Sequence, residues 1–211
     1  MADVKICGIS TIAALDAAIA GGASHVGFVH FAKSPRHLPI DAMAQLRRHV
    51  PAHVQAVTLL VNAPPDLVHA VISAVQPDAL QFHGEETPLQ LQSARANFAG
   101  ELWKALPIRT RADLALSSQW NGAADRLLYD AKPVPGADLP GGNGLRFDWH
   151  LLEGFAHPLP WALAGGLDPA NVARAIARTH APLVDVSSGV ESAPGIKDVD
   201  RIAAFLKAAK L

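Results

Sequence analysis

Short apolar runs alternate with amphipathic segments along almost the whole chain. Runs rich in β-branched residues predict strands, and apolar residues three or four positions apart predict helices. The predicted strands cover residues 4–6, 24–31, 53–61, 79–82, 101–106, 126–131, 160–164 and 183–187. Helices are predicted over residues 11–20, 40–49 and 148–152, from residues 64, 111 and 169 onward, through residues 89–91, and around residues 202–206.

These elements form eight β-then-α units. Their strands begin roughly 20–35 residues apart, so the sequence predicts a single-domain (β/α)8 TIM barrel over residues 1–211. The alternative is a doubly wound open sheet, which usually has a glycine-rich fingerprint after its first strand, and residues 7–10 (CGIS) do not form one. The helix after the seventh strand has the clearest start, with Asp168 as N-cap and Pro169 in the first turn.

Composition and charge narrow the class of protein. Half of the residues are hydrophobic and the formal net charge is −1, which indicates a globular chain with no nucleic-acid partner. A single cysteine excludes an internal disulfide and any zinc site that needs two or four cysteines, and the ten histidines show no metal-binding spacing. No apolar run approaches the ~18 residues of a membrane span, and the N-terminus lacks a signal-peptide pattern. We therefore expect a cytoplasmic protein with no metal and no membrane partner.

Enzymes built on this barrel place their chemistry at the carboxyl ends of the strands. Small or polar residues follow six of the predicted strands here, and no comparable set stands at the opposite ends. These residues are Cys7-Gly8, Ser34-Pro35-Arg36, Gln81 to Gly84, Asp130, Gly165-Gly166 and Ser187-Ser188-Gly189. The site is therefore expected at this end of the barrel.

Two glycine-bearing loops follow the last two predicted strands. Gly165-Gly166 and Ser187-Ser188-Gly189 would let a ligand approach backbone N–H groups closely, and the serines add hydroxyl groups. Barrels usually bind phosphate with the loops after strands seven and eight. We interpret the two loops as a phosphate site, and ordinary tight turns are the alternative.

Cys7 and Asp130 are the candidates for proton transfer. Cys7 shares a strand face with Lys5 and would act as a general base if its pKa falls below the free value of ~8.5. A buried, inert thiol is the alternative. Asp130 ends an apolar strand, where it would act as a general acid or instead cap a turn.

Three further polar residues follow or interrupt predicted strands. Arg36 comes after a proline-fixed turn and would bind a carboxylate with two hydrogen bonds, or be an ordinary exposed arginine. His83 shares a face with Gln81 and would line the pocket or hydrogen-bond the loop backbone. Asp185 lies within a strand, which is costly unless it is paired. Because the first and last strands of a closed barrel are neighbours, we predict an interior Lys5–Asp185 ion pair.

The longest irregular segment covers residues 132–147 and contains three prolines and four glycines. Loops of this length are often active-site lids. Gly141, Gly142 and Gly144 would let this loop fold over a substrate and exclude water.

Read together, seven segments resemble the phosphoribosylanthranilate isomerase family of tryptophan biosynthesis. They are VKICGI, GFVHFAKSPRHL, LQFHGEE, LLYDAK, PGGNGLRFDW, LAGGLDPANV and VDVSSGVESAPGIKD, in the family's order and over nearly the whole chain. The resemblance implies a ribulose-phosphate-binding type of barrel that needs no metal and no organic cofactor. It also implies an Amadori rearrangement of N-(5-phosphoribosyl)anthranilate to 1-(2-carboxyphenylamino)-1-deoxyribulose 5-phosphate.

The same resemblance implies residue roles. Cys7 matches the family's general base, Asp130 its general acid, and Arg36 the residue that holds the anthranilate carboxylate, while the last two loops bind the phosphate. The chain departs from the family's usual residues at His30, Tyr129 and Asn143. These departures affect the expected polarity of the pocket and the closure of the lid, not the reaction.

Two alternatives stay open at this stage. One is another phosphosugar isomerase, such as a related enzyme that uses aspartates after strands one and six, although the first position here is Cys7. The other is a non-catalytic barrel that binds a phosphorylated ligand. In each case we expect a small-molecule phosphosugar as partner, and a chain that is a monomer or a homodimer.

Overall fold

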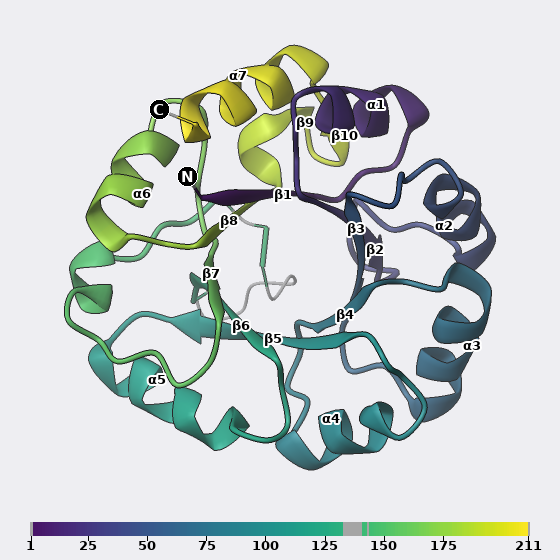
Figure 1. The fold of residues 1–211 in the computed structure, drawn as a ribbon, viewed down its shortest axis with the longest axis horizontal. Helices are drawn as coiled ribbons and strands as arrows, with labels where there is room; N and C mark the ends of the chain where they lie inside the picture. Colours follow the sequence, from purple (N-terminus) through teal and green to yellow (C-terminus); the bar gives the residue numbers. More distant parts are fainter. Residues whose placement is uncertain (1, 133–140, 143, 211) are drawn as a thin grey trace.

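The structure, a computed structural model, describes residues 2–132, 141–142 and 144–210. Eight parallel strands form one closed barrel, in which each strand pairs with the next one along the chain. β1 pairs with both β2 and β8, which closes the barrel (Figure 1). The barrel strands are β1 (Asp3–Cys7), β2 (His25–His30), β3 (Gln55–Leu60), β4 (Ala79–Phe82), β5 (Glu101–Ile108), β6 (Arg126–Ala131), β7 (Trp161–Leu163) and β8 (Leu183–Val186). The predicted barrel is therefore confirmed, and the open sheet is excluded.

Helices surround the ring of strands on its outer side (Figure 1). They are α1 (Ile12–Ala20), α2 (Ile40–Arg47), α3 (Pro65–Val75), α4 (Pro88–Arg95), α5 (Arg111–Ala115), α6 (Val172–Thr179) and α7 (Val199–Ala209). Short 3₁₀ helices cover Leu116–Trp120, Trp149–Leu152 and Ser188–Val190. The second of these follows β6, where the sequence predicts a short helix, and it is capped by the Asp148 side chain.

The predicted start of α6 is wrong. The helix begins at Val172 after Asn171, and Asp168 is not its N-cap. Asp168 instead accepts hydrogen bonds within the preceding turn, from the backbone N of Ala170 to its side chain (2.8 Å) and from the backbone N of Val172 to its carbonyl (3.1 Å). A local Asp-Pro signal fits both a helix N-terminus and such a turn, because aspartate side chains bind nearby N–H groups in either setting.

A short antiparallel hairpin between β8 and α7 was not predicted from the sequence. It consists of β9 (Glu191–Ala193) and β10 (Ile196–Lys197). Gly195, in the turn between them, has φ +82°, a conformation that glycine adopts without strain. The Pro194-Gly195 pair is a turn signal that could have revealed the hairpin, although strands of two or three residues carry too little pattern to be recognised.

The interior of the barrel combines an apolar belt with one buried ion pair. The belt consists of Val57, Ala79, Trp103, Ala105, Leu128, Ala162, Ala164 and Leu183. Lys5 on β1 and Asp185 on β8 stand opposite each other in register, with Nζ and Oδ1 2.9 Å apart and side chains 0% and 8% exposed. The predicted Lys5–Asp185 pair is therefore confirmed.

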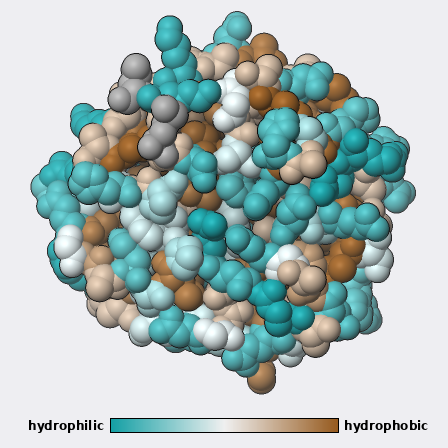
Figure 2. Space-filling model, viewed as in Figure 1, coloured by the Kyte–Doolittle hydropathy of each residue, from teal (hydrophilic) through white to brown (hydrophobic). Residues whose placement is uncertain are grey.

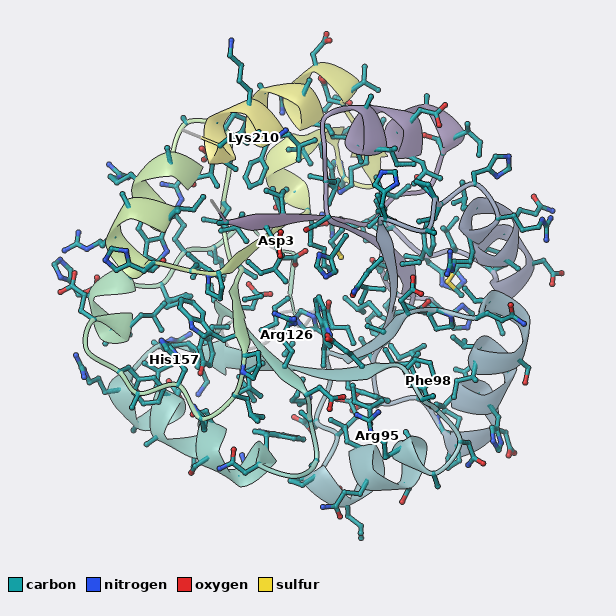
Figure 3. All side chains as sticks on the ribbon, in the orientation of Figure 1. Asp3, Arg95, Phe98, Arg126, His157 and Lys210 are labelled. Carbon is teal, nitrogen blue, oxygen red and sulfur yellow. The ribbon has the colours of Figure 1, made fainter. Side chains whose placement is uncertain are left out.

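Polar side chains fill the amino-terminal end of the barrel interior. The Arg126 guanidinium lies inside the ring of strands (Figure 3), 5.0 Å from the centre of the Trp103 ring, and also pairs with Glu101. The buried His25 ring contacts Trp103 at 5.4 Å and lies 2.8 Å from the Ser24 hydroxyl. Burial lowers the pKa of His25 to about 4, and the nearby positive charges of Arg126 and Lys5 act in the same direction.

On the outer surface, hydrophilic residues cover most of the face seen in Figure 2, and hydrophobic residues form small separate patches. Ile12, which the sequence places on an apolar helix face, is 42% exposed. None of the helices in the described part of the chain is long and apolar enough to cross a membrane.

The buried neutral His25 predicts a pH-dependent stability. Between pH 6.5 and about 4 the unfolded chain binds a proton at this residue that the folded protein does not, so the stability falls as the pH drops through this window. Integrated over the window, the loss is about 3 kcal/mol. We expect His25→Asn to flatten this part of the pH profile in urea unfolding experiments. The exposed His53→Asn control should keep the wild-type profile, and parallel curves for wild type and His25→Asn would contradict the prediction.

Candidate active site

A cavity opens where the barrel strands end, and residues from widely separated parts of the sequence line it. The apolar part of its wall comes from Val29, Leu59 and their neighbours Phe31 and Val61. The sequence-predicted site residues that line it are Cys7, Arg36, His83, Asp130, Gly141, Gly142, Gly144, Gly165, Gly166, Ser187 and Ser188. The structure therefore brings together almost all of the residues singled out from the sequence.

Gly189 is the predicted site residue that does not line the cavity. A Cβ atom at this position would lie 1.9 Å from the carbonyl oxygen of Leu167. The absence of a side chain therefore allows the loop after β8 to pack directly against the loop after β7. Gly189 supports the shape of the rim and lies outside the lining itself.

Cys7 ends β1, and its side chain lies on the same strand face as Lys5. The thiol is 3% exposed, yet it forms part of the cavity wall. Burial raises the pKa of the Cys7 thiol, whereas the positive charges of Lys5 and Lys197 oppose this and the carboxylate of Asp185 adds to it. The pKa of Cys7 is therefore raised rather than lowered, because desolvation outweighs the neighbouring cations.

Asp130 lies near the end of β6 with its carboxyl group held at both oxygens. Oδ1 accepts a hydrogen bond from the backbone N of Ala131 (2.8 Å), and Oδ2 lies 3.3 Å from Nε2 of His83. The Gln81 amide lies 2.9 Å from Nδ1 of the same ring. When Gln81 Nε2 donates to Nδ1, the ring proton is on Nε2 and faces the carboxyl group. Asp130 thus lines the cavity and also accepts a backbone hydrogen bond where its strand ends.

The loop that carries His83 is held by a buried ion pair beneath it. Lys104 Nζ donates to the Gly84 carbonyl (2.6 Å) and to Glu86 Oε2 (2.7 Å), and both side chains are 3% exposed. Glu86 in turn accepts hydrogen bonds from the backbone N atoms of Gly84 and Asn62. Burial lowers the pKa of Lys104, and the adjacent Glu86 carboxylate counteracts this. The pair therefore fixes the end of β4 and the position of the His83 ring.

Arg36 is buried rather than exposed, and it is bound by a carboxylate that sequence reasoning missed. Its Nε donates to Glu191 Oε1 (2.7 Å), and its Nη2 donates to Glu191 Oε2 (2.9 Å) and to the Gly142 carbonyl (3.3 Å). Glu191 lies 155 positions away in the sequence, so no local pattern relates the two residues. The remaining nitrogen, Nη1, faces Gly142, where an added Cβ would lie 2.7 Å from it.

Three residues depart from the family pattern, and the two of them that the structure describes, His30 and Tyr129, lie away from the cavity. His30 bonds through Nδ1 to the Leu38 carbonyl (2.8 Å). Tyr129 points outward from β6 and is fully buried, with its hydroxyl 3.2 Å from Nδ1 of His157, and burial raises its pKa to about 12. Neither residue lines the cavity. Asn143 lies outside the described residues.

Across the described ranges, which omit residues 133–140 and 143, no group of three or more His, Cys, Asp or Glu side chains could hold a metal ion. The cavity is lined by thiol, carboxyl, imidazole and guanidinium groups, and these are groups that transfer protons or bind anions.

The fold and the cavity together define a (β/α)8-barrel enzyme with its site at the carboxyl ends of the strands. A family model described as N-(5'phosphoribosyl)anthranilate (PRA) isomerase matches residues 4–208. The chain belongs to this family of isomerases of tryptophan biosynthesis.

Individual members of this family match the chain over almost the full length of both proteins. An N-(5'-phosphoribosyl)anthranilate isomerase of Erythrobacter litoralis is 52% identical over 210 residues, covering 100% of this chain and 99% of the relative. The crystal structure of phosphoribosyl anthranilate isomerase from Thermotoga maritima matches with a TM-score of 0.89 and 33% identity, covering 100% and 99%. A phosphoribosyl anthranilate isomerase in complex with reduced 1-(o-carboxyphenylamino)-1-deoxyribulose 5-phosphate matches with a TM-score of 0.87 and 32% identity, again covering 100% and 99%.

Two glycines with left-handed backbones allow a matched test of how tightly the site is packed. Gly165 (φ +86°) has no room for a Cβ, which would lie 2.7 Å from the Ala131 N and 3.0 Å from Asp130 Oδ1. Gly154 (φ +66°) has nothing within 4 Å. We expect Gly154→Ala to cost about 1 kcal/mol of stability from the backbone alone. Gly165→Ala should cost about 2 kcal/mol more and lower the activity. Equal losses for the two variants in urea unfolding would show that the loop after β7 yields to the added methyl group.

Proposed function

We propose that this chain catalyses the Amadori rearrangement of N-(5-phosphoribosyl)anthranilate to 1-(2-carboxyphenylamino)-1-deoxyribulose 5-phosphate, with Asp130 as general acid and Cys7 as general base. The observation that carries the proposal is that Cys7, Asp130 and Arg36 line one cavity in a chain of this family. The reaction needs one proton donor, one proton acceptor and sites for two anionic groups, and the cavity contains candidates for each.

Asp130 acts first in the proposed mechanism. It donates a proton to the ring oxygen of the ribose, the bond between this oxygen and C1′ breaks, and the nitrogen lone pair forms a protonated Schiff base at C1′. The contact between His83 Nε2 and Asp130 Oδ2 orients the carboxyl group. Gly141 supports this geometry, because a Cβ there would lie 2.5 Å from both of these atoms.

Cys7 then removes the proton at C2′. The positive Schiff-base nitrogen withdraws electrons from C2′, so the C–H bond becomes acidic and its electron pair moves to form an enolamine. The enolamine tautomerises to the ketone of the product. No electron leaves the substrate, so the step is an isomerisation. Each positioned proton transfer of this kind typically contributes about 10²–10⁴-fold to the rate.

The two anionic groups of the substrate match two parts of the cavity rim. Glu191 holds the guanidinium group of Arg36 in place, and the Nη1 atom of Arg36 is available for the anthranilate carboxylate. Gly165, Gly166 and the two serines after β8 line the other side, where they offer backbone N–H and hydroxyl groups to the phosphate. The relative solved with a reduced product analogue carries the same two anionic groups in its ligand.

The two alternative functions that the sequence left open fit this geometry less well. A phosphosugar isomerase with two catalytic aspartates would need a carboxyl group where Cys7 ends β1. A non-catalytic binding barrel would have no need of a thiol and a carboxyl group in the same cavity.

Removing either proton-transfer group tests the mechanism. We expect Cys7→Ser and Asp130→Asn each to lower kcat by about 10²–10⁴-fold, because neither replacement transfers a proton efficiently near neutral pH. Turnover is followed by the loss of anthranilate-type fluorescence with freshly made substrate. Substrate binding should persist in both variants, as measured by calorimetry with a non-reacting product analogue. A variant that keeps near-normal turnover would remove the role proposed for that residue.

Arg36→Lys tests the carboxylate site with the charge retained. A lysine cannot form the two parallel hydrogen bonds to Glu191 and also present a further N–H group to the substrate carboxylate, as the guanidinium does, so we expect KM to rise about tenfold or more, with a smaller effect on kcat. The exposed Lys33→Met serves as the control, with unchanged kinetics. An unchanged KM for Arg36→Lys would show that the carboxylate binds elsewhere.

A further inference from the structure

A buried ion cluster lies behind Arg36 and is centred on the hairpin that follows β8. Glu191 Oε1 accepts from Arg36 Nε (2.7 Å) and from Lys197 Nζ (2.6 Å). Its Oε2 accepts from Arg36 Nη2 (2.9 Å) and from the backbone N of Gly195 (3.2 Å). The side chains of Arg36, Glu191 and Lys197 are 6%, 4% and 1% exposed. Both oxygens of Glu191 are thus fully used inside the protein.

Lys197 connects this cluster to the ends of β8 and β1. Its ammonium group also donates to the Ser187 carbonyl (2.9 Å) and approaches the Ser187 hydroxyl (3.3 Å). A Cβ placed on Gly8, the residue directly after Cys7, would lie 3.3 Å from Lys197 Nζ and 2.8 Å from Arg36 Cδ. The hairpin therefore brings a lysine ammonium against the backbone that carries the Cys7 thiol.

The charges around Cys7 do not balance when the thiol is protonated. Three cations, Lys5, Arg36 and Lys197, face two carboxylates, Asp185 and Glu191, and all five side chains are nearly buried. An unbalanced buried cation is costly. In the described part of the chain, the other titratable residues that line the cavity are His83 and Asp130, which contact each other. An anion next to Lys197 would remove the imbalance, and the Cys7 thiol, which directly precedes Gly8, is a group able to become one.

We propose that Lys197 is a positioning residue with two tasks: it anchors the Glu191–Arg36 pair, and it supplies the positive charge that stabilises the Cys7 thiolate. Lys5 also acts on the thiol, through its charge and a hydrogen bond, but its ammonium is paired at 2.9 Å with Asp185, whose carboxylate acts on the thiol in the opposite direction. The part that concerns Arg36 as a substrate ligand rests on the function proposed above. The part that concerns the thiolate is independent of any catalytic activity.

The single cysteine of the chain makes the thiolate directly measurable. We would titrate the ultraviolet absorbance of the thiolate in each protein and subtract the same protein with Cys7→Ser. In Lys197→Met the thiolate fraction at a fixed pH below the midpoint should fall about tenfold, which is the effect of losing one nearby opposite charge. Lys197→Arg should restore the wild-type titration, and the exposed Lys207→Met should leave it unchanged. An unchanged midpoint in Lys197→Met would overturn the proposal.

A second comparison repeats the test in a different background. Glu191→Gln and the double variant Glu191→Gln/Lys197→Met differ by the same lysine, so they measure its effect on the thiol without the Glu191 carboxylate. The thiolate midpoint should be about one pH unit higher in the double variant than in Glu191→Gln. Equal midpoints in these two folded proteins would also overturn the proposal. Folding of every variant is checked by circular dichroism.

Kinetics separate the two tasks of the cluster. Glu191→Gln should mainly raise KM, because Arg36 loses its fixed orientation. Lys197→Met should mainly lower kcat/KM near neutral pH and regain activity as the pH rises and the thiol ionises. A purely structural role would instead lower activity equally at every pH, which contradicts the proposal. If Cys7→Ser keeps its activity, the role proposed for Cys7 as general base fails, yet the thiol titration still decides the role of Lys197.

Discussion

The buried ion pair between Lys5 and Asp185 joins the first barrel strand to the last, and the site depends on the register that it marks. Nζ and Oδ1 are 2.9 Å apart between strands separated by almost the whole chain. Strand side chains alternate, so the residue two positions beyond each partner lies on the same interior face. These residues are Cys7 and Ser187, and both line the cavity. A shift of one residue between β1 and β8 would turn one of them away from it.

The sequence alone was sufficient for the features that depend on local periodicity. The barrel was predicted from the alternation of strand-like and helical segments. The ends of the predicted strands then placed Cys7, His83, Asp130 and the two glycine loops at one rim. The Lys5–Asp185 pair was also predictable, because closure makes β1 and β8 neighbours. In each of these cases the spacing along the chain and the topology of the fold determine the contact without any knowledge of side-chain conformation.

Features that depend on distant partners or on burial escaped this reasoning. Glu191 binds Arg36 across 155 positions, and its hairpin is too short to show a pattern. Asp168 gave a helix-start signal, but an Asx-type turn satisfies the same side chain. The direction of the Cys7 pKa shift could not be obtained from the sequence either, since it reflects the balance between desolvation and the charges of Lys5, Lys197 and Asp185. That balance exists only once the chain has folded.

The proposed acid and the proposed base share one cavity, and the two roles place opposite demands on their surroundings. A general acid must keep its proton until the substrate arrives, whereas a thiol that acts as a base must lose its own. Burial favours the neutral thiol, so burial alone does not prepare Cys7 for the proposed role. The described charges are accordingly unequal across the cavity: Lys5, Arg36 and Lys197 gather on the side of Cys7, while Asp130 contacts the His83 ring and a backbone N–H. The uneven placement of cations thus favours the thiolate on the Cys7 side of the cavity, where burial by itself opposes it.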